Sequence, residues 1–260
     1  MHPFLNIFGF QLPTYGLMMA LALISAISFS YFRTKKAGLD PDKLLNVAIF
    51  AIGIGMAGAY LFYIFVTYSP REIFASIADG SFRVFKDGGL VFYGGFIVGA
   101  LTAYIACRVQ KLKFSEYAAV VIPSIPLAHA LGRVGCFFAG CCYGRVMQSA
   151  ISVVYTNPIG GAPVGVPVFP IQLVEAFLNI VIFVILLIYT HKRLRSGTGF
   201  FLYLAMYAVV RFSLEYFRAD EVRGIFLGLS TSQWISIAML IFGVLGFIIL
   251  RRKEKAAASA

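Results

Sequence analysis

Seven apolar runs, each close to the length of one bilayer crossing, constrain this chain more than any other feature of its sequence. An α-helix needs roughly 17–25 apolar residues to cross about 30 Å of hydrocarbon. Helices are expected rather than a barrel, because backbone groups that face lipid must be satisfied within their own segment and the sequence has no alternating strand pattern. The expected spans are residues 12–32, 44–66, 89–107, 117–138, 171–189, 200–217 and 234–250. The sequence therefore predicts an all-α polytopic membrane protein with seven transmembrane helices.

Composition excludes a soluble globular domain. The chain is 60% hydrophobic and 13% charged, whereas soluble domains contain about 45–50% apolar residues. Its net charge of +11 could suggest nucleic acid as a partner. The basic residues, however, stand at the ends of the apolar runs rather than along one face or tail, so the charge indicates membrane topology and anionic lipid. We expect the bilayer, and no nucleic acid, as a partner.

The distribution of lysine and arginine predicts the orientation. Fourteen of the 22 basic residues lie in the loops after the first, third and fifth runs and in the C-terminal tail. By the positive-inside rule these segments are cytoplasmic, which places the N-terminus outside and the C-terminus inside. The segment 139–170 is rich in proline and glycine and is expected to form a small irregular outer head, in which 153–155 and 166–168 could pair as strands. We expect residues 1–260 to form a single domain without a removable signal peptide.

Arg133, at the end of the fourth run, is the first candidate site residue. A buried charge in a bilayer costs from about 3 to more than 10 kcal/mol unless it meets an anion or water. His129 lies one helical turn before Arg133, so both side chains can share a face, and Gly132 would allow a ligand or helix to approach closely. The alternative is structural: His129 would bond another helix and Arg133 would reach the headgroups.

Arg211 provides a second buried charge, in the sixth run. Tyr207, Arg211 and Glu215 are spaced by four residues and share one stripe of a helix. They could form a satisfied ion pair only. Two arginines near the same outer end of the membrane would instead make a cleft for phosphate, which guanidinium binds well, and we favour this interpretation. The remaining candidates for substrate binding are Tyr15, Gly88, Gly89, Gly94, Gly95, Gly144, Gln172 and Glu175, and Tyr93 joins Arg133, Arg211 and His129 as a catalytic candidate.

Two of these candidates also have simple structural explanations. Glu175 stands in the first turn of the fifth run, where an acidic group is favoured by the helix dipole. Tyr15, at the outer end of the first run, could be an interfacial aromatic.

Three of the four cysteines, Cys136, Cys141 and Cys142, fall within seven residues. No second pair completes a four-ligand zinc ribbon, although His129 could add one ligand, so we expect neither a metal site nor a cofactor. A disulfide between Cys136 and Cys141 or Cys142 stays open, and free thiols are favoured. A membrane redox or metal sensor and an anion transporter are the competing functions; a transporter would be expected to show inverted repeats, which the sequence lacks.

Several motifs, in this order along the chain, carry a family resemblance. They are Tyr15-Gly16-Leu17-Met18, Asp87-Gly88-Gly89 with Phe92-Tyr93-Gly94-Gly95, Gly132-Arg133-Val134-Gly135-Cys136-Phe137 through Gly144-Arg145, Pro170-Ile171-Gln172-Leu173 with Glu175, and Tyr207 through Arg211 to Glu215-Tyr216-Phe217-Arg218. With them the chain resembles the bacterial phosphatidylglycerol:prolipoprotein diacylglyceryl transferases over nearly its whole length.

This resemblance implies transfer of a diacylglyceryl group from phosphatidylglycerol to the lipobox cysteine of a preprolipoprotein, in the bacterial inner membrane, with release of glycerol phosphate. Arg133 and Arg211 would stabilise the departing phosphate. Many members carry a histidine where this chain has Tyr93, which is a poor base at neutral pH; His129 is a substitute that could activate the acceptor thiol. Members commonly have asparagine at Cys136 and an acidic residue at Cys141. A related lipid transferase with another acceptor is the nearest alternative.

Overall fold

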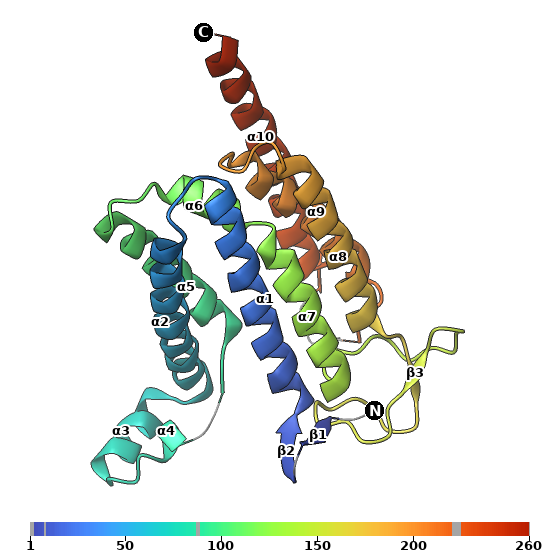
Figure 1. Cartoon of the computed structure of the whole chain (residues 1–260). Helices are drawn as coiled ribbons and strands as arrows, with labels where there is room; N and C mark the ends of the chain where they lie inside the picture. The colour runs from blue at the N-terminus through green and yellow to red at the C-terminus, as the bar shows by residue number, and fades with distance from the viewer. Residues whose placement is uncertain (1–2, 8, 87–88, 220–224, 260) are drawn as a thin grey trace. The chain divides into compact units, whose positions relative to one another are not determined.

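The computed structural model describes residues 3–7, 9–86, 89–219 and 225–259, and most of them are helical (Figure 1). The helices are α1 (Thr14–Lys36), α2 (Pro41–Thr67), α3 (Pro70–Ala78), α4 (Arg83–Lys86), α5 (Phe92–Val109), α6 (Phe114–Val121), α7 (Ser124–Ala139), α8 (Ile171–Thr190), α9 (Thr198–Glu215) and α10 (Thr231–Ser259). The strands are β1 (Phe4–Ile7), β2 (Phe10–Pro13), β3 (Val153–Val154), β4 (Pro167–Val168), β5 (Ile225–Phe226) and β6 (Leu229–Ser230).

The chain divides into two compact units. Unit 1 contains Met1–Arg33 and Ala118–Ala260, and unit 2 contains Thr34–Tyr117. Each unit is described by itself.

Within the described residues, four helices are long and apolar enough to cross a membrane: α1, α2, α8 and α10. A fifth span results if α6 and α7 are counted as one bent crossing. Each of the seven predicted runs lies largely within helical structure, but α5 is a shorter apolar helix and α9 carries Arg211 and Glu215 near its end. The protein is therefore a polytopic membrane protein with four or five candidate spans.

The predicted run 117–138 is interrupted by a bend of 44° between α6 and α7. Pro123 stands at the break and has no N–H to donate to the preceding turn. Pro126 removes a second donor within the first turn of α7. The helix direction therefore changes immediately before the segment that carries His129 and Arg133.

Three short antiparallel hairpins correct the all-α prediction. In the first, β1 pairs with β2 from Phe4↔Pro13 to Ile7↔Phe10, so helix α1 begins at Thr14 rather than at residue 12. In the second, β3 and β4 pair Val153 with Val168, which confirms the pairing expected within the outer segment. The third joins β5 to β6, just before α10.

Glycines let α2 and α5 approach closely in unit 2. A Cβ atom added at Gly94 would lie 2.8 Å from the Gly58 carbonyl oxygen, and one added at Gly95 would lie 3.1 Å from Ala59 Cβ. Small-residue seams of this kind are common between membrane helices.

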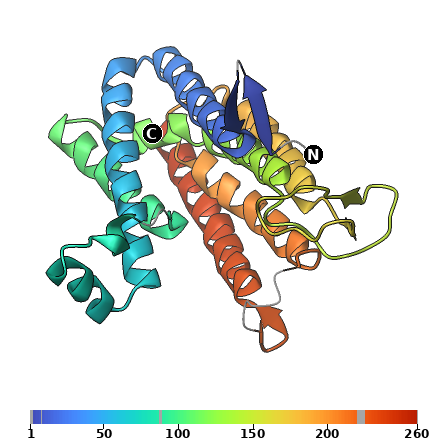
Figure 2. The ribbon, with the colours of Figure 1, turned by 90° about the horizontal axis from the view of Figure 1, so that it is seen from below.

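In unit 1, α7, α8, α9 and α10 pack successively against one another, and Figure 2 shows α9 and α10 side by side. Ile122, Ile182, Leu186 and Tyr203 form a buried apolar cluster in this unit. This packing positions the polar stripes of α7, α8 and α9.

Candidate functional site

Helix α7 presents a polar stripe and a glycine face. His129, Arg133 and Cys136 are spaced by four and three residues, which places them on one side of the helix. A Cβ atom added at Gly135 would lie 3.1 Å from Met18 Cβ and 3.4 Å from the Tyr15 ring. The glycine face therefore packs on α1, and the polar stripe is available to other partners.

Helix α8 contributes a stripe of fully buried polar residues, Gln172, Glu175 and Asn179. Gln172 Nε2 donates to the Cys141 carbonyl at 2.7 Å and to the Tyr155 hydroxyl at 3.2 Å. Gln172 Oε1 and Asn179 Oδ1 have no hydrogen-bond partner among the described residues. An unsatisfied buried polar atom costs about 1–3 kcal/mol, so these two oxygens mark a place where fold stability alone does not explain the sequence.

Arg133 and Glu175 form an ion pair between α7 and α8. Arg133 Nε lies 3.0 Å from Glu175 Oε2, and the same nitrogen donates to His129 Nε2 at 3.3 Å. His129 Nε2 lies 3.4 Å from Glu175 Oε1. The three side chains thus form one group, in which Glu175 binds both basic partners rather than capping its own helix.

Arg211 and Glu215 form a second ion pair within α9. Arg211 Nη1 lies 2.6 Å from Glu215 Oε2, and Arg211 Nη2 donates to the Ser232 hydroxyl at 3.0 Å. Glu215 Oε1 accepts from the Ser230 hydroxyl at 2.8 Å. Two serines from the start of α10 and the strand before it therefore hold the pair in place.

Tyr207 links the two ion pairs. Its ring lies 5.4 Å from the His129 ring and 5.9 Å from that of Tyr203, between ring centroids. Tyr207 also lies one helical turn before Arg211 on α9. Its ring therefore contacts the group around Arg133 and shares a helix stripe with the Arg211–Glu215 pair.

The segment after α7 forms main-chain hydrogen bonds with a residue just before the start of α8 and with a residue just after the end of α9. Gly144 N–H donates to the Phe169 carbonyl at 3.1 Å, and Arg145 N–H donates to the Phe217 carbonyl at 2.9 Å. A Cβ atom at Gly144 would lie 2.6 Å from the Phe169 oxygen and 2.8 Å from the Phe217 oxygen. Gly144 therefore allows two backbone segments to approach closely. Arg145 adds a side-chain contact, because its Nε donates to the carbonyl of the buried Arg218 at 3.3 Å.

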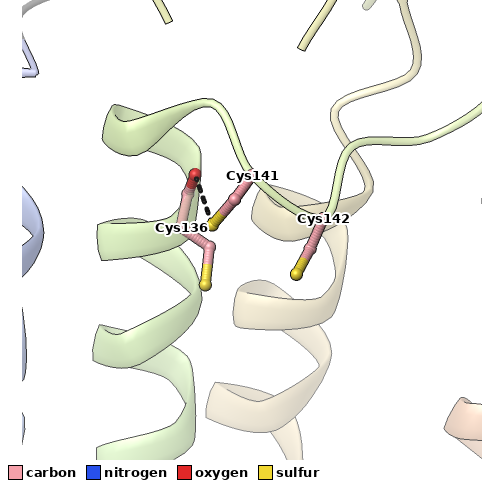
Figure 3. Close-up of side chains that lie close together, drawn as sticks. All are labelled: Cys136, Cys141 and Cys142. Atoms are coloured by element: carbon pink, nitrogen blue, oxygen red, sulfur yellow. Dashed lines mark hydrogen bonds between the residues drawn. The ribbon is translucent and has the colours of Figure 1, made fainter. Parts of the chain in front are cut away.

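The thiols of Cys136, Cys141 and Cys142 form a cluster beside Arg133 (Figure 3). The three cysteines are partly buried and not disulfide-bonded, as favoured from the sequence. The neighbouring thiols of Cys136 and Cys141, together with the positive charges of Arg133 and Arg218, lower the pKa of the Cys142 thiol below its usual value. Among the described residues, these three thiols are close enough to one another to hold a metal ion together.

The other predicted site residues are described in the unit to which each belongs. Tyr15 stands in the first turn of α1, half exposed, and interacts electrostatically with the three cysteines and Arg133. Tyr93 stands in the first turn of α5, in unit 2, and its side chain is exposed. Gly89 packs on the Tyr63 ring. Gly94 and Gly95 pack on α2, as described under the fold. Gly132 lies 3.6 Å from Met19, measured from an added Cβ. Gly88 lies outside the described residues.

Sequence reasoning did not single out several residues at this site. Asn179 carries a readable signal, because it extends the polar stripe of Gln172 and Glu175 by one helical turn. Arg218 ends the last stretch that carries the family resemblance but was not among the candidate site residues. Ser230 and Ser232 stand outside the predicted spans, where polar residues are ordinary. No pattern in the sequence distinguishes them from loop residues.

Comparisons with known proteins were made for the whole chain. Residues 3–249 match the family model described as prolipoprotein diacylglyceryl transferase. A phosphatidylglycerol–prolipoprotein diacylglyceryl transferase of Clostridium tetani is 36% identical over 253 residues, covering 96% of this chain and 98% of that protein. One from Clostridium perfringens is 34% identical over 96% of this chain and 95% of its own length. One from Dehalococcoides mccartyi is 32% identical over 94% of this chain and 91% of its own length.

Proposed function

The chain belongs to the prolipoprotein diacylglyceryl transferase family and has its transferase activity, and from this we propose how its residues carry out the reaction. The names of the relatives give phosphatidylglycerol as the donor and prolipoprotein as the acceptor. We propose that this chain joins the diacylglyceryl group of phosphatidylglycerol to the lipobox cysteine of a preprolipoprotein and releases glycerol phosphate.

The chemistry requires a site that stabilises a growing negative charge. The acceptor sulfur attacks the glycerol carbon, the bond from that carbon to a phosphate oxygen breaks, and the electron pair leaves with the phosphate. Preplaced cationic donors in a dry site stabilise such charge, and removing one donor commonly costs about 10²–10³ in rate. In this chain the donors are Arg133 and Arg211.

The pairing of Arg133 with Glu175 is the observation that carries this proposal. Every recorded contact of Arg133 with the described residues uses Nε, which leaves its two Nη groups to bind phosphate oxygens. The carboxylates of Glu175 and Glu215 offset two of the three nearby guanidinium charges, so the site keeps a net positive charge that suits an anionic headgroup. Gln172 Oε1 and Asn179 Oδ1 are further acceptors for substrate hydroxyls.

His129 has a geometry that favours positioning over proton transfer. Its Nε2 atom accepts from Arg133 Nε–H at 3.3 Å and also lies 3.4 Å from Glu175 Oε1, so this nitrogen faces the ion pair. We propose that His129 orients the ion pair and that the acceptor thiol loses its proton by another route.

The full topology is also part of this proposal. We propose that α5 and α9 complete seven spans, with the N-terminus outside, the C-terminus in the cytoplasm, and the protein in the cytoplasmic membrane of a bacterium. The excess of basic residues on the α1–α2, α5–α6 and α8–α9 connections and in the C-terminal tail supports this orientation.

Reconstitution with defined substrates tests the function. Purified protein is incubated with phosphatidylglycerol and a lipobox peptide, and the diacylglyceryl thioether is detected by mass spectrometry. We expect product from the parent and from Cys107→Ser, and loss of about 100-fold or more in Arg133→Ala and Arg211→Ala. Product from Arg211→Ala at the parental rate would contradict the phosphate-binding role. Product on a serine peptide equal to that on a cysteine peptide would contradict the acceptor.

A further inference from the structure

The three sulfur atoms of Cys136, Cys141 and Cys142 have a spacing close to that of a metal site. They lie within 4.8 Å of one another. Tetrahedral zinc with Zn–S bonds of about 2.3 Å requires sulfur atoms about 3.8 Å apart, so side-chain shifts of no more than about 1 Å would bring these three to that geometry. Figure 3 shows the three side chains pointing toward one another from the end of α7 and the loop after it.

The backbone builds this cluster in advance. Gly140 takes a left-handed conformation with φ of 72° at the end of α7, and the N–H of Cys141 then bonds the Cys136 carbonyl at 3.1 Å. This turn motif brings Cys141 back beside the last turn of the helix. Gln172 Nε2 holds the Cys141 carbonyl from α8, and Gly160 lies so close that an added Cβ would be 2.5 Å from Cys141 Cβ. The loop is therefore fixed from three sides.

Cys142 is held in a conformation that few non-glycine residues adopt. Its φ is +54°, in the left-handed region that is unfavourable for a residue with a side chain. Such strain persists where the surrounding structure enforces it, often at functional sites. Here it lies at the residue whose thiol completes the cluster.

Positive charge surrounds the thiols. The Arg133 and Arg218 side chains both interact with Cys142, and Arg133 also interacts with Cys136. Three thiolates and one Zn²⁺ carry one net negative charge, which these guanidinium groups offset. Thiolate ligands also suit Zn²⁺ among divalent ions.

We propose that Cys136, Cys141 and Cys142 form a zinc site whose fourth position binds the acceptor thiol of the prolipoprotein. Among the described residues, the ligating group contains these three side chains and no fourth. Catalytic zinc sites use three protein ligands and keep one position for water or substrate, whereas structural sites use four. The proposal deepens the function above and rests on it for the identity of the acceptor.

The site would supply the step that His129 and Tyr93 do not. The acceptor thiol displaces water from zinc and releases its proton to solvent, because a thiol that coordinates zinc is deprotonated. The bound sulfur then forms its bond to the glycerol carbon as the carbon–oxygen bond breaks and the phosphate leaves on the arginines. The product thioether carries no charge, binds zinc weakly and is replaced by water.

Metal binding is the first test. Protein purified under reducing conditions and stripped with a chelator is dialysed against Zn²⁺, and bound zinc is measured by elemental analysis. We expect one zinc per chain in the parent and in Cys107→Ser, whose cysteine is buried on α5, and almost none in Cys136→Ser or Cys142→Ser. No zinc in the parent, or equal zinc in Cys136→Ser, would overturn the proposal.

Cobalt then reports the fourth ligand without any need for activity. Co²⁺ in the site gives thiolate-to-metal absorption that we expect to rise by about one third when a lipobox peptide adds a fourth thiolate. A peptide with serine in place of the cysteine is the matched control and should leave the spectrum unchanged. An unchanged spectrum with the cysteine peptide would overturn acceptor coordination. Arg211→Ala, expected to lose transfer, should retain both signals, which separates this proposal from the phosphate-binding role.

The pH profile distinguishes thiol activation from a structural role. A free thiol with a pKa near 8.5 is about 3% ionised at pH 7, so Cys142→Ser should transfer about 30-fold more slowly than the parent at pH 7. The deficit should disappear above about pH 9, where the acceptor ionises by itself. Among the described residues, the ionisable groups that interact with the cluster are Tyr15, Arg133, Tyr155 and Arg218. A deficit that stays constant with pH would contradict the proposed activation.

Discussion

The two partly buried arginines of the site use their donors differently, although both belong to carboxylate pairs. Arg133 contacts Glu175 and His129 through Nε alone. Arg211 uses Nη1 for Glu215 and Nη2 for Ser232. Arg133 therefore has the larger number of donors left for a ligand, and the shape of its side chain is as important as its charge.

Arg133→Lys should slow diacylglyceryl transfer by about 100-fold or more, because lysine keeps the charge but loses the forked donors that bind phosphate. Initial rates with phosphatidylglycerol and a lipobox peptide measure the effect. Arg33→Lys is the matched control, since Arg33 is also buried but bonds the Val120 carbonyl and the Thr190 hydroxyl. Arg33→Lys should leave the rate per folded molecule unchanged. A parental rate in Arg133→Lys would show that charge alone is sufficient.

Glu175→Gln should lower the free energy of unfolding by at most about 3 kcal/mol, because it leaves the partly buried Arg133 without its counter-charge. Thermal unfolding in detergent measures the loss. The double variant Arg133→Met with Glu175→Gln should recover part of the stability, since neither charge is then buried alone. Exposed Glu72, in the capping box of α3, serves as control, and Glu72→Gln should have a much smaller effect. Additive losses in the double variant would exclude a direct pair.

At the residue scale, the sequence predicted charged partners where spacing within one helix defines them. Arg211 and Glu215 follow the i,i+4 rule, and His129 precedes Arg133 by the same interval. The sequence did not predict that Glu175 would pair with Arg133, because that contact depends on how α7 and α8 pack. The sequence grouped the three cysteines but did not predict how close their sulfur atoms lie, because the turn at Gly140, rather than spacing along the chain, brings them together.

Helix packing in unit 2 depends on glycine at the contact rather than on large apolar residues. The α2–α5 seam places backbone atoms of one helix against those of the other at Gly58, Gly94 and Gly95. The sequence suggested Gly94 and Gly95 for substrate approach. What approaches them is a neighbouring helix, which a single sequence cannot distinguish from a ligand.

Gly94→Ala and Gly53→Ala should have opposite effects on stability. A Cβ at Gly94 would lie 2.5 Å from Phe62 Cβ and 2.8 Å from the Gly58 oxygen, so the helices must separate at a cost of about 1–3 kcal/mol. Gly53 is in α2, the partner of α5, and has nothing within 4 Å of an added Cβ. Alanine at this position should stabilise the helix by about 0.4–1 kcal/mol. Chemical denaturation measures the free energy of unfolding of both variants. Equal destabilisation would contradict the close contact between α2 and α5.

Apolar length predicted the positions of the helices, but local chemistry decided where they begin and bend. Gly9, with φ of +87°, lies in the turn of the β1–β2 hairpin, and this hairpin moves the start of α1 to Thr14. Pro123 divides the fourth predicted run. A window that averages hydropathy does not register a single missing N–H or a single left-handed residue, so both features were absent from the sequence prediction.

Over the whole molecule, basic residues at one set of helix ends define the proposed orientation. If the C-terminal tail is cytoplasmic, a fluorescent protein fused after α10 should fluoresce, and alkaline phosphatase fused at the same point should be inactive. Phosphatase inserted in the loop between β3 and β4 should be active, because the proposal places that loop outside. An active C-terminal phosphatase fusion would reverse the topology and with it the proposed side of the reaction.

Gly144 and Arg145 connect α8 and α9 through their main chain. Their N–H groups donate to the carbonyls of Phe169, just before α8, and Phe217, just after α9. Phe177 and Val209 point outward from the same two helices. We therefore expect that libraries varied at such outward positions can alter acyl-chain selectivity while the charges proposed for catalysis keep their spacing.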